Sequence, residues 1–443
     1  MKQSYSKLHI VIAALVLTAA LWAQSGAGLE LTLRQAIEQA VQHNLQTRSA
    51  QESIAESRAH RGTARSALLP NLSGSAYQAS LTENLAALGF SPSTIPGIPA
   101  FIGPYNNFDA RFQATQSLFD LPALRKYQSA REGVRLAEQK RQLAEQEVTT
   151  STILGYIAVL EAGQSVAAAE ANVQLAQRLL DLAANQRNAG IATGLDVVRA
   201  ETRLAGQQVR LSQAQNSQDT ARLNLLRVIG APLSGRASLS DTMRFEPQRR
   251  PEAEAPLQQA LANRLELAVA AEQLRIAQTE RQAAVAGYAP SVSAFGNYGS
   301  SGVKPNELNL PTRSVGVRID VPIFNGGRTR SEVQASTSRV RQAEMQLEDL
   351  RAGVERDVRE ALNDLRTREA QMNAAQKNLD LAQKELVLSE DRFRNGVADN
   401  IEVTNAQTAV ENARWEAVSG LAQYTQARLG IYSAIGRVAD FTF

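Results

Sequence analysis

Two stretches of the sequence, QRNAGIATGLDVVRAET (186–202) and RFRNGVADNIEVTNAQT (392–408), carry one pattern 206 residues apart. Aligned without a gap, Gly190 falls on Gly396, and both glycines interrupt a long helical pattern that resumes a few residues later. Glycine takes a positive φ without a steric clash, so it suits a chain reversal. The repeated pattern therefore predicts two equivalent helical hairpins.

The duplication extends over most of the chain. Residues 31–77 match 251–298 at an offset of 220, and SLFD (117–120) matches PIFN (322–325) at an offset of 205. Such a repeat, rather than length, decides the architecture, and each half reads as helix, strand, loop, strand, very long helix, turn and helix. The expected segments are a signal peptide, 1–23; a first repeat, 29–229, with strands about 71–80 and 107–119, a long helix about 121–187 and a tip turn 188–195; a linker, 230–256; a second repeat, 257–438, with strands about 291–300 and 313–324, a long helix about 327–394 and a tip turn 395–401; and a tail, 439–443.

The N-terminus has the layout of a secretory signal peptide. Lys2 and Lys7 precede an apolar run over 10–21, and we expect cleavage after Ala23. No later segment has an uninterrupted apolar run of the length that a spanning helix needs, the longest being ILGYIAVL at 153–160. We therefore expect an exported chain without a membrane-spanning helix.

Composition argues against several classes of function. The chain has no cysteine, which excludes disulfides and a lipid anchor on a cysteine. Its charge is near neutral once the signal is removed, so nothing favours nucleic acid as a partner. After the signal the only histidines are His43 and His60, and neither has clustered ligands. With no phosphate loop and no nucleophile motif, we expect neither an enzyme nor a metal or other cofactor.

Two predicted strands alternate between apolar and polar residues. One has valine or isoleucine at every second position over 315–323, and the other alternates over 108–118. In an exported chain this pattern suits an outer-membrane barrel with apolar side chains toward lipid and polar ones toward a lumen, although alternation alone also fits a soluble sandwich. The candidate lumen residues are Asp109, Arg111, Arg318 and Asp320.

The predicted helices are longer than a globular core requires. At 1.5 Å per residue the segment 121–187 would reach roughly 100 Å. Apolar residues, many of them alanines, recur at spacings of three and four in the seams of a coiled coil. Examples of these seam residues are Val134, Ala137, Ala144, Val148, Ala169, Ala176, Leu347, Leu350, Val354, Ala382 and Leu386.

The number of strands limits how a barrel can form. About four strands cannot close one, and an open sheet in lipid leaves backbone groups unpaired. Two copies would give eight strands, with an interior filled by side chains, whereas three would give twelve and leave room for water. A conduit therefore favours three copies.

The order of these features resembles the TolC family of outer-membrane efflux proteins. The resemblance rests on LTLRQAIEQAVQHN (31–44), ALLPNLS (67–73), SLFD and the two glycine turns, and it covers about 29–438. It implies a mainly α fold with a β-barrel part: a homotrimer with a shared twelve-stranded barrel in the outer membrane and a periplasmic helical tunnel. It also implies passive export in a tripartite efflux or type I secretion system, with a periplasmic adaptor and an inner-membrane transporter as partners. A mixed equatorial region would fall at 230–256 and the tail.

The resemblance also assigns roles to the hairpin tips. It implies that their surfaces dock the adaptor, whereas the residues alone equally fit well-made turns. The docking residues would be Gly190, Ile191, Leu195, Gly396, Val397 and Ile401.

Two acids beside the turns have both a structural and a functional interpretation. Thr193-x-x-Asp196 and Asp399-x-x-Glu402 both have the spacing of a capping box. By resemblance, Asp196 is a gate acid and Glu402 belongs to a selectivity ring, where carboxylates attract cations.

The sequence departs from the family pattern at the gate. The second acid of the ring corresponds to Asn405, and the tyrosine and arginine of the gate correspond to Phe393 and Ala398. We expect a tip gate in which arginines nearby take part instead. These arginines are Arg199, Arg392 and Arg394. The alternative function is a periplasmic coiled-coil scaffold or adaptor without a pore, which explains the heptads but not the strand faces.

Overall fold

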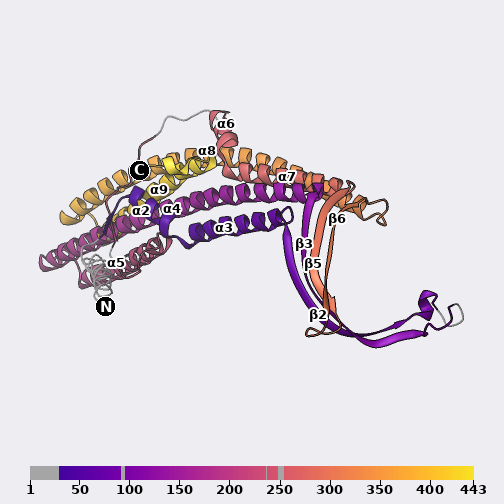
Figure 1. Ribbon diagram of the computed structural model, residues 1–443. Coiled ribbons are helices and arrows are strands. Elements are labelled where there is room, and N and C mark those ends of the chain that lie inside the picture. Colours follow the sequence, from indigo (N-terminus) through magenta and orange to yellow (C-terminus); the bar gives the residue numbers. More distant parts are fainter. Residues whose placement is uncertain (1–28, 91–94, 236, 248–253) are drawn as a thin grey trace, which may run out of the picture. The chain divides into compact units, whose positions relative to one another are not determined.

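The computed structural model describes residues 29–90, 95–235, 237–247 and 254–443. The predicted signal peptide lies outside the described residues. The chain divides into two compact units, one formed by Met1–Gln51, Gln139–Ala268 and Asp349–Phe443, the other by Glu52–Glu138 and Val269–Glu348. In chain order (Figure 1) the elements are β1 (Leu29–Leu31), α2 (Leu33–His43), α3 (Leu45–Ser66), β2 (Asn71–Asn84), η1 (Ala86–Leu88), β3 (Phe101–Phe119), α4 (Leu121–Asn188), α5 (Gly194–Val228), β4 (Ala237–Leu239), α6 (Glu254–Asn263), α7 (Leu265–Ala286), β5 (Ser291–Gly302), β6 (Asn309–Asp320), α8 (Arg328–Arg394), α9 (Asn400–Ala434) and η2 (Val438–Asp440).

The second unit contains one antiparallel sheet in the order β2-β3-β5-β6. β6 ends at Asp320, earlier than the 324 that its alternation predicts, because Pro322 cannot donate to a ladder. It also begins four residues earlier than predicted, at Asn309, because an edge strand tolerates Pro311. β3 begins at Phe101 rather than 107, since its first residues pair with β2 beyond the end of β5.

The strand register gives the sheet one polar and one apolar face. Arg111 pairs with Gly299 on β5, and Ser293 on β5 pairs with Arg318, so the four candidate lumen residues lie on the same face. The opposite face carries large apolar side chains that the chain leaves exposed. They include Leu72 (72%), Phe112 (66%), Tyr298 (63%), Val315 (87%), Val317 (63%) and Ile319 (65%).

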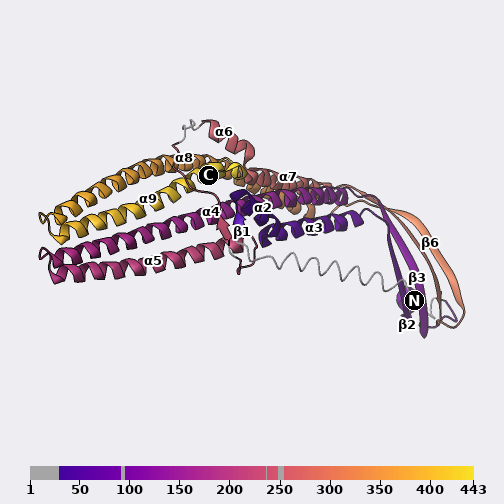
Figure 2. The same cartoon turned by 90° about the vertical axis from the view of Figure 1, so that its left-hand side faces the viewer.

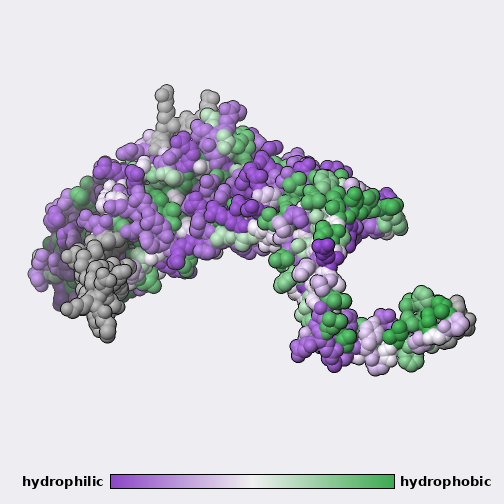
Figure 3. All heavy atoms as spheres, in the orientation of Figure 1, coloured by the Kyte–Doolittle hydropathy of each residue, from purple (hydrophilic) through white to green (hydrophobic). Residues whose placement is uncertain are grey.

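The loop end of the β2–β3 hairpin is also apolar. Leu88 (65% exposed), Phe90 (48%) and Phe101 (60%) lie there, and Figure 3 shows the apolar residues of this end gathered together. On the polar face of the same sheet, two of the charged side chains pair with each other. Arg111 donates to Asp109 through Nε at 2.5 Å and through Nη2.

The first unit contains two helical hairpins, one of α4 from Gln139 onward with α5, the other of α8 from Asp349 onward with α9. Figure 2 shows these helices running along one another, with both hairpin tips at the same end. The predicted seams are buried: Ala169 and Ala176 on α4 are 1% and 2% exposed, and Val354 on α8 is 0% exposed. Alanine in these seams lets the helices approach closely.

Away from the tips, this unit has a core built around the middle of α4. Ile153, Tyr156 and Ile157 are fully buried there, together with Leu31 from β1 and Phe441 from the tail. The Tyr156 hydroxyl lies 2.8 Å from the Leu31 carbonyl oxygen and 2.8 Å from Asp241 Oδ2. The predicted tail is therefore part of a mixed layer, with the short parallel pair β1–β4 beside it.

The apolar run 153–160 is not buried on every side within one chain, because Leu154 is 43% exposed. The expectation of no helix able to span a membrane is corrected. Among the described residues α4 contains one 18-residue window that meets the length and composition required, with a mean hydropathy of 1.3 and 33% of it buried.

Each repeat has an equivalent close contact between a glycine after its last helix and the end of its first short helix. Gly230, after α5, has φ 70°, and a Cβ there would lie 2.9 Å from His43 Cβ. Gly436, after α9, has φ 73°, and a Cβ there would lie 2.9 Å from the backbone of Asn263. His43 and Asn263 are the last residues of α2 and α6, so the duplication preserves a close approach that only glycine permits.

We expect Tyr156→Phe to lower the stability of the first unit by about 1–2 kcal/mol, because Asp241 and the Leu31 carbonyl lose a buried donor. The measurement is the urea midpoint of the detergent-solubilised protein. Tyr288→Phe is the matched control, since Tyr288 is 57% exposed and removal of its hydroxyl should leave the midpoint unchanged. Equal midpoints for Tyr156→Phe and the native protein would contradict the role assigned to this hydroxyl.

Candidate functional site at the hairpin tips

Both tip turns end a long helix in the same way. In the first, Gly190 has φ 76°, and the Ile191 N–H donates to the Gln186 carbonyl at 2.9 Å. In the second, Gly396 has φ 70°, and the Val397 N–H donates to the Arg392 carbonyl at 2.9 Å. These bonds satisfy carbonyl groups that a helix end leaves free, and they require a left-handed residue at the glycine.

The start of α5 is a complete capping box. The Thr193 hydroxyl accepts from the Asp196 N–H at 3.4 Å, and Asp196 Oδ2 accepts from the Thr193 N–H at 2.8 Å. The Thr193 hydroxyl also donates to the same carboxylate at 2.7 Å. Asp196 therefore has a structural role within its own chain, as the sequence spacing predicted.

The start of α9 differs from that prediction. Asp399 alone caps the helix, accepting from the N–H groups of Ile401 and Glu402 at 3.1 Å each. The Glu402 carboxylate does not return to the cap but forms an ion pair with Arg392 Nε at 3.0 Å. The predicted second capping box is thus only half present, because aspartate at the cap position satisfies both free N–H groups without a second acid.

Polar contacts join the two tips directly. Gln186 Nε2 donates to the Arg394 carbonyl at 3.0 Å, and Asn400 Nδ2 donates to Asp196 at 3.3 Å (carbonyl oxygen) and 3.4 Å (Oδ1). Neither Gln186 nor Asn400 was identified from the sequence. Gln186 is only 7% exposed in the structure, so its amide is buried in the contact between the tips. In the sequence, a glutamine in a helical seam does not indicate such a contact.

The residues that replace the family's gate pattern lie in different environments. Phe393 is 5% exposed and packs with Val403 and Ala406, so it is a core residue and presents no polar group. Asn405 is exposed on α9. Of the three neighbouring arginines, Arg392 pairs with Glu402, Arg199 lies 3.9 Å from Asp196, and Arg394 pairs only locally with Asp391.

The outer surface of the tips is apolar. Ile191, Leu195, Val397 and Ile401, which the resemblance implies for docking, are 54%, 58%, 68% and 52% exposed. Large apolar side chains exposed together are typical of a surface that another protein covers.

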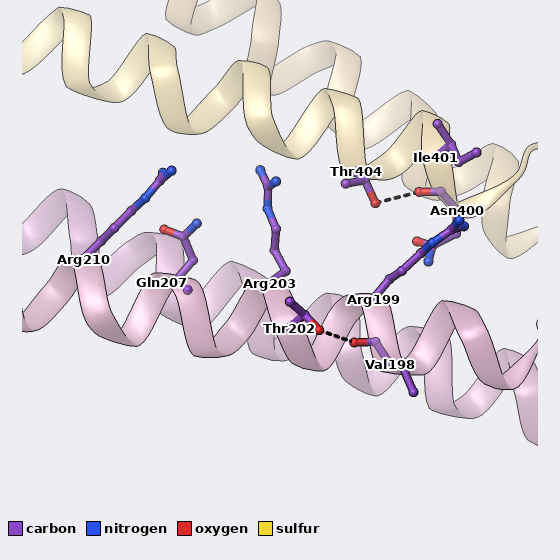
Figure 4. A pocket seen from close by; sticks show the side chains of 10 residues that line it. Val198, Arg199, Thr202, Arg203, Gln207, Arg210, Asn400, Ile401 and Thr404 are labelled. Atoms are coloured by element: carbon purple, nitrogen blue, oxygen red, sulfur yellow. Dashed lines mark hydrogen bonds between the residues drawn. The ribbon is translucent and has the colours of Figure 1, made fainter.

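A groove of about 480 Å³ runs between α5 and α9 above the tips (Figure 4). One wall carries three arginines, and the side chains of Arg203 and Arg210 extend across toward α9 in Figure 4. The lining residues are Val198, Arg199, Thr202, Arg203, Gly206, Gln207, Arg210, Asn400, Ile401 and Thr404.

The electrostatics of the tip acids follow from these contacts. The hydrogen bonds from Thr193, first from its side chain and then from its backbone, lower the pKa of Asp196, with smaller help from Asn400 and Arg199. Because the pKa of Asp196 is lowered on folding, its ionised carboxylate stabilises the tip fully at any pH above the usual carboxyl pKa. This stabilisation is lost as the pH falls from there through the lowered pKa of the folded state. Burial raises the pKa of Glu390 on α8, an effect that Arg178 and Arg394 oppose. The described residues contain no cluster of three metal ligands.

Comparisons with known proteins agree with this architecture. A profile of the outer membrane efflux protein family matches residues 36–231 and 257–437. The chain is 25% identical over 343 residues to the alkaline protease secretion protein AprF of Pseudomonas aeruginosa, covering 76% of this chain and 71% of that protein. It is 26% identical over 348 residues to the outer membrane protein TolC of Escherichia coli, covering 76% and 70%. Its fold is similar to that of VceC of Vibrio cholerae, with a TM-score of 0.76, 17% identity and coverage of 91% and 96%.

We expect Asp196→Ala to expose the Thr193 N–H and to weaken the start of α5 by about 1 kcal/mol. Hydrogen exchange at the Thr193 amide should then accelerate roughly fivefold. Glu402→Ala is the matched comparison, because Glu402 does not cap α9 and its loss should leave exchange at the start of that helix unchanged. Faster exchange in both variants would show that the two acids act alike, contrary to the structure.

Proposed function

Because this chain belongs to the outer membrane efflux protein family, we propose that three copies of it form one continuous exit channel. The chain is an outer-membrane channel protein that extends into the periplasm. In the proposed assembly it conducts substrates passively, without catalysis, as the last component of a tripartite efflux or type I secretion system. An inner-membrane transporter selects the substrate, and a periplasmic adaptor connects the two.

The sheet carries the argument for three copies. Its two edge strands, β2 and β6, each have one unpaired side, and its apolar face is exposed along the whole ladder. Unpaired backbone groups are costly in lipid, so β6 of one copy must pair with β2 of the next until the ring closes. Three sheets of this size give twelve strands, which leave a water-filled lumen.

The polar face then lines the lumen. Arg111 and Asp109 largely neutralise each other on β3, whereas the Arg318 guanidinium lies 5.4 Å from the centre of the Phe295 ring on the neighbouring strand. With Asp320 beside it on β6, each copy would contribute both signs of charge to the barrel interior. A lumen of mixed charge suits a conduit that does not select its substrate.

The tips form the proposed entrance. Their exposed apolar residues would receive the helical hairpin of the adaptor, and the polar contacts between them would hold the entrance closed. Three copies of Glu402 around a narrow mouth would attract cations. Asp196 and Asn400 would act as gate residues by linking the hairpins, while Asn405 contributes no charge to the ring.

A pore-free scaffold remains the alternative to exclude. It would need no partner for the sheet edges, and it leaves the exposed apolar face of the sheet without an explanation. The native mass of the mature protein, extracted from membranes in mild detergent, separates the two proposals. We expect a mass of three protomers and channel conductance in planar bilayers. A monomer released without detergent would refute the shared barrel.

We expect Glu402→Gln to reduce the preference of the open channel for cations, because it removes one carboxylate per copy from the entrance. The measurement is the reversal potential across a salt gradient in planar bilayers. Asp391→Asn is the matched control, since Asp391 pairs with Arg394 along α8 and lies outside the proposed ring. An unchanged reversal potential for Glu402→Gln would remove Glu402 from the ring and leave the channel proposal intact.

A further inference from the structure

A buried acid joins the two hairpins well above their tips. Glu411 on α9 is 1% exposed, and its Oε2 atom accepts from three side chains of α5. The donors are Arg203 Nη2 at 3.1 Å, Gln207 Nε2 at 3.0 Å and Arg210 Nη1 at 3.4 Å. Arg203 Nη2 also donates to the Thr408 hydroxyl at 2.5 Å. We call these five side chains the Glu411 cluster.

The cluster lies apart from the contacts at the tips. Glu411 follows Glu402 by nine residues along α9, which is about 13 Å of helix. Between the two levels the hairpins meet through the apolar residues Val403, Ala406 and Val410. A second polar connection therefore holds α5 against α9, and a change at the tips alone would not release it.

The cluster is incompletely satisfied in this arrangement. Within the described part of the chain, Glu411 Oε1 and Arg203 Nε are buried without a hydrogen-bond partner. Buried polar groups are nearly always paired, and each unpaired one is costly. A buried ion pair is also a poor source of stability compared with apolar residues of the same volume. Stability of the closed bundle therefore does not explain why a carboxylate and two guanidiniums meet here.

A change of arrangement does explain it. Arg203 and Arg210 also line the groove between α5 and α9, and Arg210 is half exposed there. If the hairpins part, both guanidiniums and the carboxylate gain water, which compensates for the lost ion pairs. Apolar residues in the same places would instead resist the separation. The cluster thus links the helices when packed and releases them at low cost when hydrated.

We propose that Glu411 is a positioning residue of the gate, which holds α5 against α9 in the closed channel and lets the hairpins separate when it opens. The inference rests on the proposed channel function. Unlike a gate formed by the tip contacts alone, this arrangement predicts that a substitution at Glu411 opens the entrance while the tip sequences stay unchanged.

The test compares Glu411→Gln with the native protein in planar bilayers. Glutamine keeps the shape but removes the charge that holds two arginines, so the open probability should rise roughly five- to tenfold. Arg203→Gln should act in the same direction, and the double variant should exceed neither single variant by much, because both remove one shared interaction. Glu201→Gln, which removes an exposed acid from α5, is the matched control and should open no more often than the native channel.

Each outcome decides a separate point. An assembled Glu411→Gln channel that opens no more often than the native one overturns the inference, as do additive effects in the double variant. Absence of conductance in the native protein would refute the channel function itself. If Glu411→Gln fails to assemble, a cross-link decides: the chain has no cysteine, so Arg203→Cys with Thr408→Cys can be joined uniquely by a short bismaleimide. The joined channel should stay closed, whereas opening with the link in place would overturn the inference.

Discussion

The backbone hydrogen bonds along the two edges of the sheet constrain the rest of the molecule. β2 and β6 each present a row of free N–H and C=O groups, and one face of the sheet is covered with large apolar side chains. Neither feature is stable alone in lipid or in water. In the proposed barrel, pairing with further copies would satisfy the edge groups, and lipid would cover the apolar face.

The duplication preserves what the backbone requires and varies what the side chains do. Both tip glycines adopt left-handed conformations. Gly230 and Gly436 lie so close to the ends of α2 and α6, respectively, that neither position has room for a Cβ. The acids at equivalent positions have diverged. Asp196 completes a capping box, whereas Glu402, relieved of that role by Asp399, pairs with Arg392. One turn geometry therefore supports a structural acid in one hairpin and a more available acid in the other.

The extent to which the sequence predicts this structure depends on the range of the interaction. Periodicity predicts the order of helices and strands, whereas the fold class came from the resemblance to a family. The long helices and tip glycines lie within a residue or two of their predicted positions because local rules determine them. The sheet was less predictable: the start of β3 at Phe101 depends on pairing with β2 rather than on its own alternation. The cross-hairpin contacts of Gln186, Asn400 and Glu411 were missed, because each joins residues some 200 positions apart and no single-chain spacing rule reports them.

The position of Phe393 explains why the hairpins depend on polar connections. The family pattern has a tyrosine there, but in this chain the ring is buried among Val403 and Ala406 and has no hydroxyl to donate. The apolar seam at this level can hold the helices together but cannot release them easily, because separation exposes its whole surface to water. Ion pairs behave in the opposite way, since hydration repays most of what separation costs them. If the tips form the proposed gate, the carboxylate and arginines between the hairpins would lower the cost of separating them, although an apolar contact also lies there.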